Sequence, residues 1–594
     1  MKALPTTNKY LLKYKWRLLL GIVFVTIANI FAIVPAQVVR NTFDLVKNTI
    51  DLYFLFKGTA HEQEVYASFT YNIVLYGLII LGMAFLRGIF MFLMRQTIIV
   101  MSRLVEYDQK NEIYAHYQSL PLSFYRRNNT GDLMARISED VGKVRMYFGP
   151  AIMYGLNLIT MSVLCISIML SINVKLTLWT LLPLPILSLT IYFVNNIIEK
   201  RSLEIQKSLS DMSTFVQEAF SGVRVIKAFA RENDSEQNFS LQTNNYHQKQ
   251  MALAKVNALF SPSVMALVGL SILIVVYVGG NEVIKGNITA GNVAEFIMYV
   301  TMLTWPFTSL GWVSSIIQRA EASQQRINEF LETKTNIISR QDIKTPIEGH
   351  IRFENVGFTY PDSGIKALKN ISFEVKKGES IAILGTTGSG KSTIANLICR
   401  LMDSVSGQIY IDNTPIQNFN IKTLRSHIGY VPQDVFLFSD TVRNNIAFGS
   451  VKLNESDMLT AAKNADLYNT IQEFPHSFDT KLGERGITLS GGQKQRLSIA
   501  RALARKPEIL ILDDCLSAVD THTENTILQN LQNVMEGCTS VIISHRVSSA
   551  KLADKIILLD KGEVVEAGTH TSLYAENGRY REMYDKQMQT EEVD

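Results

Sequence analysis

The sequence contains few cysteines and has a small net charge. Its 594 residues include four cysteines, and none has the CxxC or CxxxH spacing of a metal site or a recognisable disulfide framework. The formal net charge of +4 is small for this length and gives no sign of a nucleic-acid partner. No cleavable signal peptide is expected, because the first apolar stretch is too long and no small-residue cleavage pattern follows it.

Long apolar runs fill the first half of the chain. Six segments have roughly 20 mostly apolar residues, which is the length of a helix that spans a bilayer. The alternative, six buried helices of a soluble core, is disfavoured by this length. The sequence therefore predicts an all-α transmembrane domain over residues 1–316, in contact with the lipid bilayer. The expected spans lie near residues 16–38, 71–95, 149–171, 173–196, 253–280 and 290–316.

The charges of the connecting loops predict the orientation. The long connections 96–148 and 197–252 each carry seven Lys or Arg residues, whereas those near 172 and 280–289 are short and almost uncharged. The positive-inside rule therefore assigns the long loops, both termini and the second half of the chain to the cytoplasm. A multi-pass protein of the cytoplasmic membrane is expected.

The two long loops are predicted to contain short crossing helices. Leu120–Arg145 and Asp211–Glu232 each read as a helix, a sharp turn with a short helix, and a second helix. Apolar side chains on such polar loops indicate a docking surface, here for the soluble half. The aromatic residues concerned are Phe124, Tyr125, Phe215 and Phe220.

The second half of the chain has the pattern of a separate α/β domain. A polar, helical stretch and a polar linker occupy residues 317–346. From Ile351 onward, short β-rich runs alternate with helical segments, as in a mostly parallel sheet. The predicted domain covers residues 347–594.

The segment "IAILGTTGSGKST" carries the strongest functional signal. A strand over Ile381–Leu384 runs into a Gly-x-x-x-x-Gly-Lys-Ser loop and then a helix. Such a loop curls its backbone N–H groups around phosphate oxygens, Lys391 reaches the β- and γ-phosphates, and the Ser392 hydroxyl binds Mg²⁺. The predicted ATP-binding residues here are Gly385, Thr386, Thr387, Gly388, Ser389, Gly390, Lys391, Ser392 and Thr393.

The segment "ILILDD" supplies a second part of the same site. Ile509–Leu512 is a continuous apolar run, typical of a strand buried on both faces. Its carboxyl end should meet the phosphate loop, because open α/β sheets bind ligands at that edge. Asp513 is then positioned to hold Mg²⁺, and Asp514 to orient the attacking water.

The segment "LSGGQKQRLSIARAL" (Leu489–Leu503) resembles the signature of ATP-binding cassette (ABC) proteins. The resemblance extends over nearly the whole chain and implies roles for further residues. Tyr360 would stack on adenine, Gln433 would bind and sense Mg²⁺, and His545 would contact the γ-phosphate. Lys481–Gly486 would touch the coupling helices, and Asp520 would lie in a loop that crosses a dimer interface.

Six spans followed by this domain resemble an exporter-type half-transporter, so the family implies a dimer. Each ATP would lie between the phosphate loop of one chain and the signature of the other. A Gly-Gly-Gln turn that opens a helix is itself an anion site of backbone N–H groups. The signature residues expected to face the partner's ATP are Leu489, Ser490, Gly491, Gly492 and Gln493.

The residue at position 514 makes the expected kind of dimer more specific. Many related sequences have Glu here, and a carboxylate misplaced by about 1 Å can cost roughly 100-fold in rate. An impaired site beside an intact signature resembles the shorter, degenerate-site subunit of bacterial heterodimeric multidrug exporters. The resemblance implies a partner half-transporter that carries Glu. Because His545 is retained, slow turnover at this site is expected.

Other assignments stay open at this point. The chain could form a homodimer with slow ATPase at both sites, or act as an ATP-gated membrane regulator, or import on an exporter scaffold. The resemblance implies small amphipathic substrates, drugs or lipids, without naming one.

Overall fold

Six helices of the chain are long and apolar enough to cross a membrane, as the sequence predicts. Apart from the end residues Ser119 and Thr130, they lie in one compact unit of this computed structural model, which describes residues 3–450, 453–516, 521–551 and 553–591. The second unit contains the β-sheets and also includes the loop segment Ser119–Thr130. The six spans are α2 (Lys15–Phe56), α3 (Glu62–Ser119), Thr130–Ile172, Val174–Ser221, α11 (Glu232–Ile284) and α12 (Ala290–Leu331).

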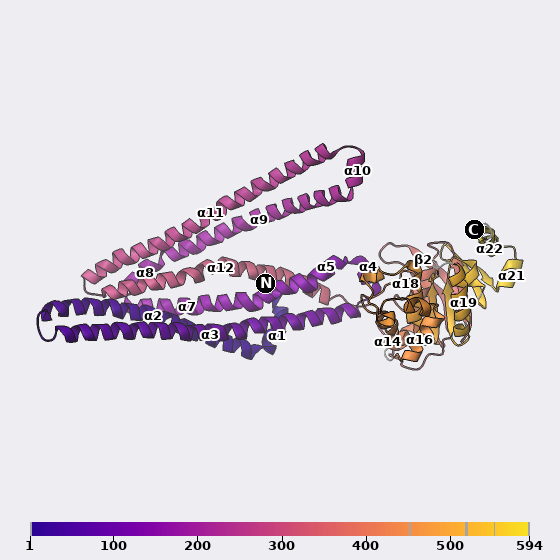
Figure 1. Cartoon of the computed structure of the whole chain (residues 1–594), viewed down its shortest axis with the longest axis horizontal. Coiled ribbons are helices and arrows are strands. Elements are labelled where there is room, and N and C mark those ends of the chain that lie inside the picture. Colours follow the sequence, from indigo (N-terminus) through magenta and orange to yellow (C-terminus); the bar gives the residue numbers. More distant parts are fainter. Residues whose placement is uncertain (1–2, 451–452, 517–520, 552, 592–594) are drawn as a thin grey trace. The chain divides into compact units, whose positions relative to one another are not determined.

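Two of the spans are built from successive helices. Shorter helices lie at the chain start and in the long loops, where α10 joins α9 to α11 and these two helices run side by side (Figure 1). The bounds of these elements are α1 (Asn8–Lys13), α4 (Leu122–Arg127), α5 (Thr130–Ala135), α6 (Val141–Met146), α7 (Ile152–Ile172), α8 (Val174–Leu181), α9 (Pro183–Ser221) and α10 (Val223–Ala228).

Helix α12 continues well beyond its apolar segment. It ends at Leu331, so the polar stretch after residue 317 is helical, as the sequence predicts, and continues the membrane span. The stretch from Ser314 to Leu331 contains no Gly or Pro and is rich in Ala, Glu, Gln and Arg, which favour helix. One continuous helix therefore includes both the membrane span and the polar stretch that follows it in the sequence.

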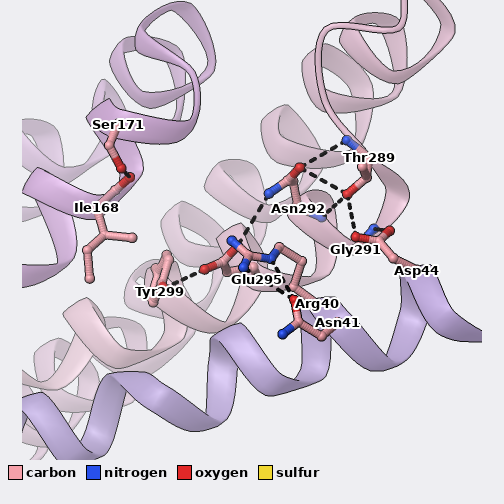
Figure 2. A network of polar contacts seen from close by, with 10 residues as sticks. All are labelled: Arg40, Asn41, Asp44, Ile168, Ser171, Thr289, Gly291, Asn292, Glu295 and Tyr299. Atoms are coloured by element: carbon pink, nitrogen blue, oxygen red, sulfur yellow. Dashed lines mark hydrogen bonds and ion pairs between the residues drawn. The ribbon is translucent and has the colours of Figure 1, made fainter.

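A polar network joins α2 to the start of α12 (Figure 2). Nη1 of Arg40 lies 3.3 Å from Oε2 of Glu295, whose side chain is fully buried. The Tyr299 hydroxyl donates to Oε1 of the same carboxylate at 2.7 Å. Asp44 accepts a hydrogen bond from the Gly291 amide at 3.1 Å, and a Cβ on Gly291 would lie 2.4 Å from the Arg40 carbonyl oxygen. The ion pair and the hydrogen bonds thus hold the two helices together, and the absence of a side chain at Gly291 lets them approach closely.

The second unit contains a six-stranded sheet and a four-stranded antiparallel sheet. The six-stranded sheet has the order β10-β9-β3-β8-β7-β6 and is parallel except for the pairing of β10 with β9. The observed helical domain followed by this α/β domain confirms the predicted fold class. The strands of the large sheet are β3 (Ser380–Gly385), β6 (Ile428–Val431), β7 (Ile509–Asp513), β8 (Thr539–Ile543), β9 (Lys555–Asp560) and β10 (Glu563–Gly568).

The four-stranded sheet has the order β2-β1-β4-β5, and helices pack around both sheets. Its strands are β1 (Ile351–Thr359), β2 (Lys366–Val375), β4 (Ser406–Ile411) and β5 (Thr414–Pro415). The helices are α13 (Lys391–Ile398), α14 (Ile421–Ser426), α15 (Val442–Ala447), α16 (Glu455–Asn464), α17 (Tyr468–Gln472), α18 (Gly491–Leu503), α19 (Thr521–Met535), α20 (Val547–Ala550), α21 (His570–Ala575) and α22 (Arg579–Glu591).

Strand β7 is buried on both faces, which explains its uninterrupted apolar sequence. Ile509 and Ile511 belong to a core shared with the antiparallel sheet and α13. Leu510 and Leu512 belong to the core under α15–α19. Alternate side chains of a strand point to opposite faces, so a run apolar at every position suits two cores. The run ends at the carboxyl edge of the sheet, where Asp513 begins the site.

Candidate nucleotide site

The loop between β3 and α13 is shaped to receive phosphate. Gly390 has a left-handed backbone with φ of 103°, and a Cβ there would lie 2.4 Å from the Ala367 carbonyl oxygen. A larger residue would therefore deform the loop where backbone N–H groups must converge. The first helical residue is Lys391, so the positive end of α13 points into the loop.

Lys391 lies against the backbone of its own loop. Its Nζ donates to the carbonyl oxygens of Gly385 at 2.8 Å and Thr386 at 2.9 Å. Burial lowers the pKa of Lys391, and the nearby Asp514 and Asp513 offset part of that effect. The ammonium group is held at the loop and can exchange these carbonyl partners for phosphate oxygens.

Asp513 is buried at the end of β7 and is paired with the phosphate loop. Its Oδ1 accepts a hydrogen bond from the Ser392 hydroxyl at 3.0 Å. Burial raises the pKa of Asp513, while the Ser392 hydrogen bond acts in the opposite direction. A bound cation beside this carboxylate would favour its charged form, so the pair has the oxygen chemistry that Mg²⁺ requires.

Asp514 is held from three directions. Its backbone has φ of 48°, in the left-handed region that Asp tolerates better than most residues. Its amide donates to the Ile543 carbonyl oxygen at 2.8 Å. Nδ1 of His545 lies 2.8 Å from Oδ1 of Asp514, and Nε2 of Gln433 donates to Oδ2 at 3.3 Å. Three of the residues predicted for hydrolysis therefore meet at one carboxylate.

These groups line one cavity of about 530 Å³. The pocket is large enough for a nucleotide-sized ligand, and both basic and acidic side chains line its wall. Among the described residues, no group of three or more His, Cys, Asp and Glu side chains forms a metal site, so a cation here would need phosphate or water ligands as well. The predicted residues on the wall are Tyr360, Thr387, Gly388, Gly390, Lys391, Ser392, Thr393, Gln433, Asp513, Asp514 and His545.

The signature segment does not contribute to this cavity. All five of its predicted residues are described, and none of them lines the wall. They open α18 instead, where Ser490 Oγ accepts from the Gln493 amide at 3.3 Å and Gln493 Oε1 accepts from the Ser490 amide at 3.0 Å. Ser490 and Gly491 are exposed, so the start of this helix is an accessible surface. Asp520 lies outside the described residues.

Tyr360 contributes an aromatic ring to the cavity wall. Its hydroxyl lies 3.0 Å from Oγ1 of Thr393, and its ring meets that of Phe358 in a T-shaped contact at 5.0 Å between centroids. Lys366 and Lys561 also line the cavity, and no sequence motif indicated either of them. They belong to β2 and to the turn after β9, and no short sequence pattern connects them with the phosphate loop.

Tyr430 in β6 is a third residue of the site that no sequence motif indicated. Its hydroxyl donates to Oδ2 of Asp513 at 3.5 Å, and burial raises its pKa. The position is two residues before Pro432 in the same "GYVPQ" segment that contains Gln433. A parallel pairing of β6 with β7 brings the two together.

Comparison with known families and proteins agrees with this geometry. The family "ABC transporter transmembrane region" matches residues 18–307, and the family "ABC transporter" matches residues 368–517. A Bacillus subtilis protein named "Probable multidrug resistance ABC transporter ATP-binding/permease protein YheI" is 38% identical over 524 residues, covering 85% of this chain and 88% of that protein.

Two further similarities extend over most of the chain. An "ATP-dependent lipid A-core flippase" of Syntrophus aciditrophicus is 33% identical over 572 residues, covering 96% of this chain and 92% of that protein. A solved structure titled "Structure of a bacterial Atm1-family ABC exporter with ATP bound" matches with a TM-score of 0.75 and 25% identity, over 96% of this chain and 98% of the other.

The chain therefore belongs to the ABC transporters, and its fold is that of the family's exporters. It is a multi-pass membrane protein with six candidate spans. Its α/β domain is an ATPase domain that binds ATP and couples hydrolysis to transport.

Proposed function

We propose that this chain is one half of a heterodimeric exporter and that its own nucleotide site hydrolyses ATP slowly. The position of Asp514 carries the proposal. Its carboxylate is held by His545 and Gln433, and its amide is bonded to Ile543, so the backbone has little freedom to advance. The side chain lacks the methylene that would bring a carboxylate to the attacking water, and about 1 Å of misplacement costs roughly 100-fold.

In this proposal the remaining site binds ATP normally. Lys391 would hold the β- and γ-phosphates, and the Ser392 hydroxyl, Asp513 and Gln433 would bind Mg²⁺. The oxygens of Ser392 and Asp513 lie 3.0 Å apart, as neighbouring ligands of one small cation can. The cation, when bound, neutralises charge on the phosphates. Asp513 also fixes the direction of the Ser392 hydroxyl.

Two exposed surfaces support a dimer. The start of α18 offers backbone N–H groups and is not part of the 530 Å³ cavity that its own phosphate loop lines, so it suits the γ-phosphate of ATP on a second chain. The loop that contains α10 exposes two phenylalanines on a polar segment, Phe220 at 75% and Phe229 at 74%. Apolar groups presented in this way favour a docking surface for a partner.

The orientation and the substrate class belong to the same proposal. Seven Lys or Arg residues in each long loop favour a cytoplasmic ATPase domain and cytoplasmic termini. The names of the relatives, for multidrug resistance and for lipid A-core transport, support a small amphipathic substrate moved out across the cytoplasmic membrane. A second candidate is a homodimer that exports a lipid, which the similarity to the flippase over 96% of this chain favours.

The ATPase activity of the purified chain separates these candidates. In lipid nanodiscs, the chain alone should hydrolyse Mg·ATP slowly, and addition of a half-transporter that carries Glu after its strand acid should raise the rate well above the sum of the two. A chain that alone reaches the rate of that pair, and loses it in Asp514→Asn, would be a homodimer. Uptake of dyes or of labelled lipids by inverted vesicles then identifies the substrate class.

A further inference from the structure

The loop helix α4 lies against the residue expected to receive the base. The segment Ser119–Thr130, which contains α4, belongs to the same compact unit as the ATPase domain. The guanidinium carbon of Arg126 lies 4.8 Å from the centroid of the Tyr360 ring. The next residue, Arg127, pairs with Asp362 in the turn that follows Tyr360. Two neighbouring arginines therefore hold one short loop of the ATPase domain.

The Tyr360 ring is held in a fixed position by further contacts. Its hydroxyl lies 3.0 Å from Thr393 on α13, and its ring meets that of Phe358 in a T-shaped contact at 90°. Its amide donates to the Ile365 carbonyl oxygen at 2.9 Å, which closes the turn. These contacts restrict the movement of the ring.

Arg126 contacts the Tyr360 ring without forming part of the cavity wall. Tyr360 lines the cavity together with Ile365 and Lys366, whereas Arg126, although described, is not one of the lining residues. A base that stacked on the ring face opposite Arg126 would complete a stack of arginine, tyrosine and base.

We propose that Arg126 is a positioning residue for the nucleotide base, acting through the ring of Tyr360. A cation on one face draws electron density toward itself and leaves the opposite face better suited to an electron-rich purine. It also fixes the ring, so that less freedom is lost when the base binds. Helix α4 starts three residues after α3 ends. Base binding would therefore act on a segment that is joined directly to the end of a membrane helix.

This inference rests on the proposed function, in which this site binds ATP, and on the expected stacking of Tyr360 on adenine. Binding measurements in the absence of turnover keep the two separable. If the chain binds no ATP, the proposed function fails. If it binds ATP and Arg126 has no effect, only the present inference fails.

The test compares ATP with inorganic tripolyphosphate, which lacks the base. Calorimetry on the full chain in nanodiscs should show that Arg126→Ala weakens ATP binding by about two- to fivefold, the range of an exposed cation–π contact. Tripolyphosphate binding should not change. Arg126→Lys should lie between the two, because it keeps the charge but loses the flat stack.

A double substitution shows whether the effect passes through the ring. Tyr360→Leu should weaken ATP binding by about tenfold, within the range for loss of a base–aromatic stack. In that background, Arg126→Ala should have no further effect. A matched control is Arg352→Ala, since Arg352 lies 4.6 Å over the ring of Tyr410 and neither residue lines the cavity.

Four results would overturn the inference. Unchanged ATP binding in Arg126→Ala would show that the contact is irrelevant to the base, and tighter binding would show that Arg126 occupies the base position itself. Equal losses for ATP and tripolyphosphate would indicate a general structural role. Additive losses in the double variant would show that Arg126 does not act through Tyr360.

Discussion

Lengthening Asp514 by one methylene should speed hydrolysis at this site. Asp514→Glu extends the carboxylate by about 1.5 Å, one C–C bond. Nδ1 of His545 and Nε2 of Gln433 now lie 2.8 and 3.3 Å from the Asp514 oxygens. Both partners are exposed, the His545 side chain at 50%, so they can follow the longer arm without repacking a core.

The expected gain is up to about 100-fold. That figure corresponds to a correction of about 1 Å in the position of the carboxylate, or about 2.7 kcal/mol of barrier. The same change should slightly destabilise the fold, because φ at this position is 48° and Glu tolerates left-handed backbone less well than Asp. A variant that is faster and yet melts at a lower temperature would therefore agree with the geometry.

The assay must isolate one site. Phosphate release is measured in nanodiscs with a partner whose catalytic Glu is replaced by Gln, so that the remaining rate comes from the Asp514 site. Asp513→Glu is the matched control, since it adds the same methylene one residue earlier. Asp513 is 2% exposed and bonded to Ser392, so lengthening it should overpack the site and lower activity. An Asp514→Glu variant no faster than the parent would refute the reasoning.

Three further results are expected. ATP binding should weaken as pH rises through the lowered pKa of Lys391, below the ordinary lysine value of about 10.4, because only the charged form pairs with phosphate; calorimetry showing constant affinity up to that value would contradict it. Gly390→Ala should abolish ATP binding without unfolding the membrane unit, because its Cβ would lie 2.4 Å from a carbonyl oxygen; retained binding in a filter assay would disprove this. Glu295→Ala should destabilise the membrane unit by about 3 kcal/mol by leaving Arg40 without its buried partner, and thermal unfolding should show partial recovery in Glu295→Ala/Arg40→Ala.

Some parts of the site could be read from short stretches of sequence. The phosphate loop and the acidic end of β7 are local, because each consists of a strand and the few residues that follow it. Their roles depend on residue type and spacing alone, so no knowledge of the remaining fold was needed. The six membrane spans could also be predicted from short stretches, because the length of an apolar run indicates a span.

The position of His545 beside Asp514 could not be read in this way. Strand β8 lies between β3 and β7, and Asp513 is in register with Ile543. Asp514 therefore lies at the same edge of the sheet as the residues that follow β8. Ile543, the partner of Asp513, is two positions before His545. A sheet order is set by packing of the whole domain, so two residues 31 apart become neighbours only after folding.

The extent of α12 could be predicted from the sequence, whereas the contacts of α4 could not. The stretch after residue 317 was expected to be polar and helical, and α12 continues to Leu331. The predicted crossing helix at Phe124 and Tyr125 is present as α4, but nothing in the sequence distinguishes Arg126 from the other basic residues of the loop. The contact of Arg126 with Tyr360 joins residues more than 200 positions apart and has no sequence signature.

The sequence by itself determined the class of protein, the two kinds of domain and the shortened acid, because each of these depends on local composition, spacing or a single side chain. Only the tertiary structure decided which groups surround that acid and which arginine lies over Tyr360. Both depend on the order of strands in a sheet and on a loop helix packed against a distant turn, and those contacts are fixed by the folded domain as a whole.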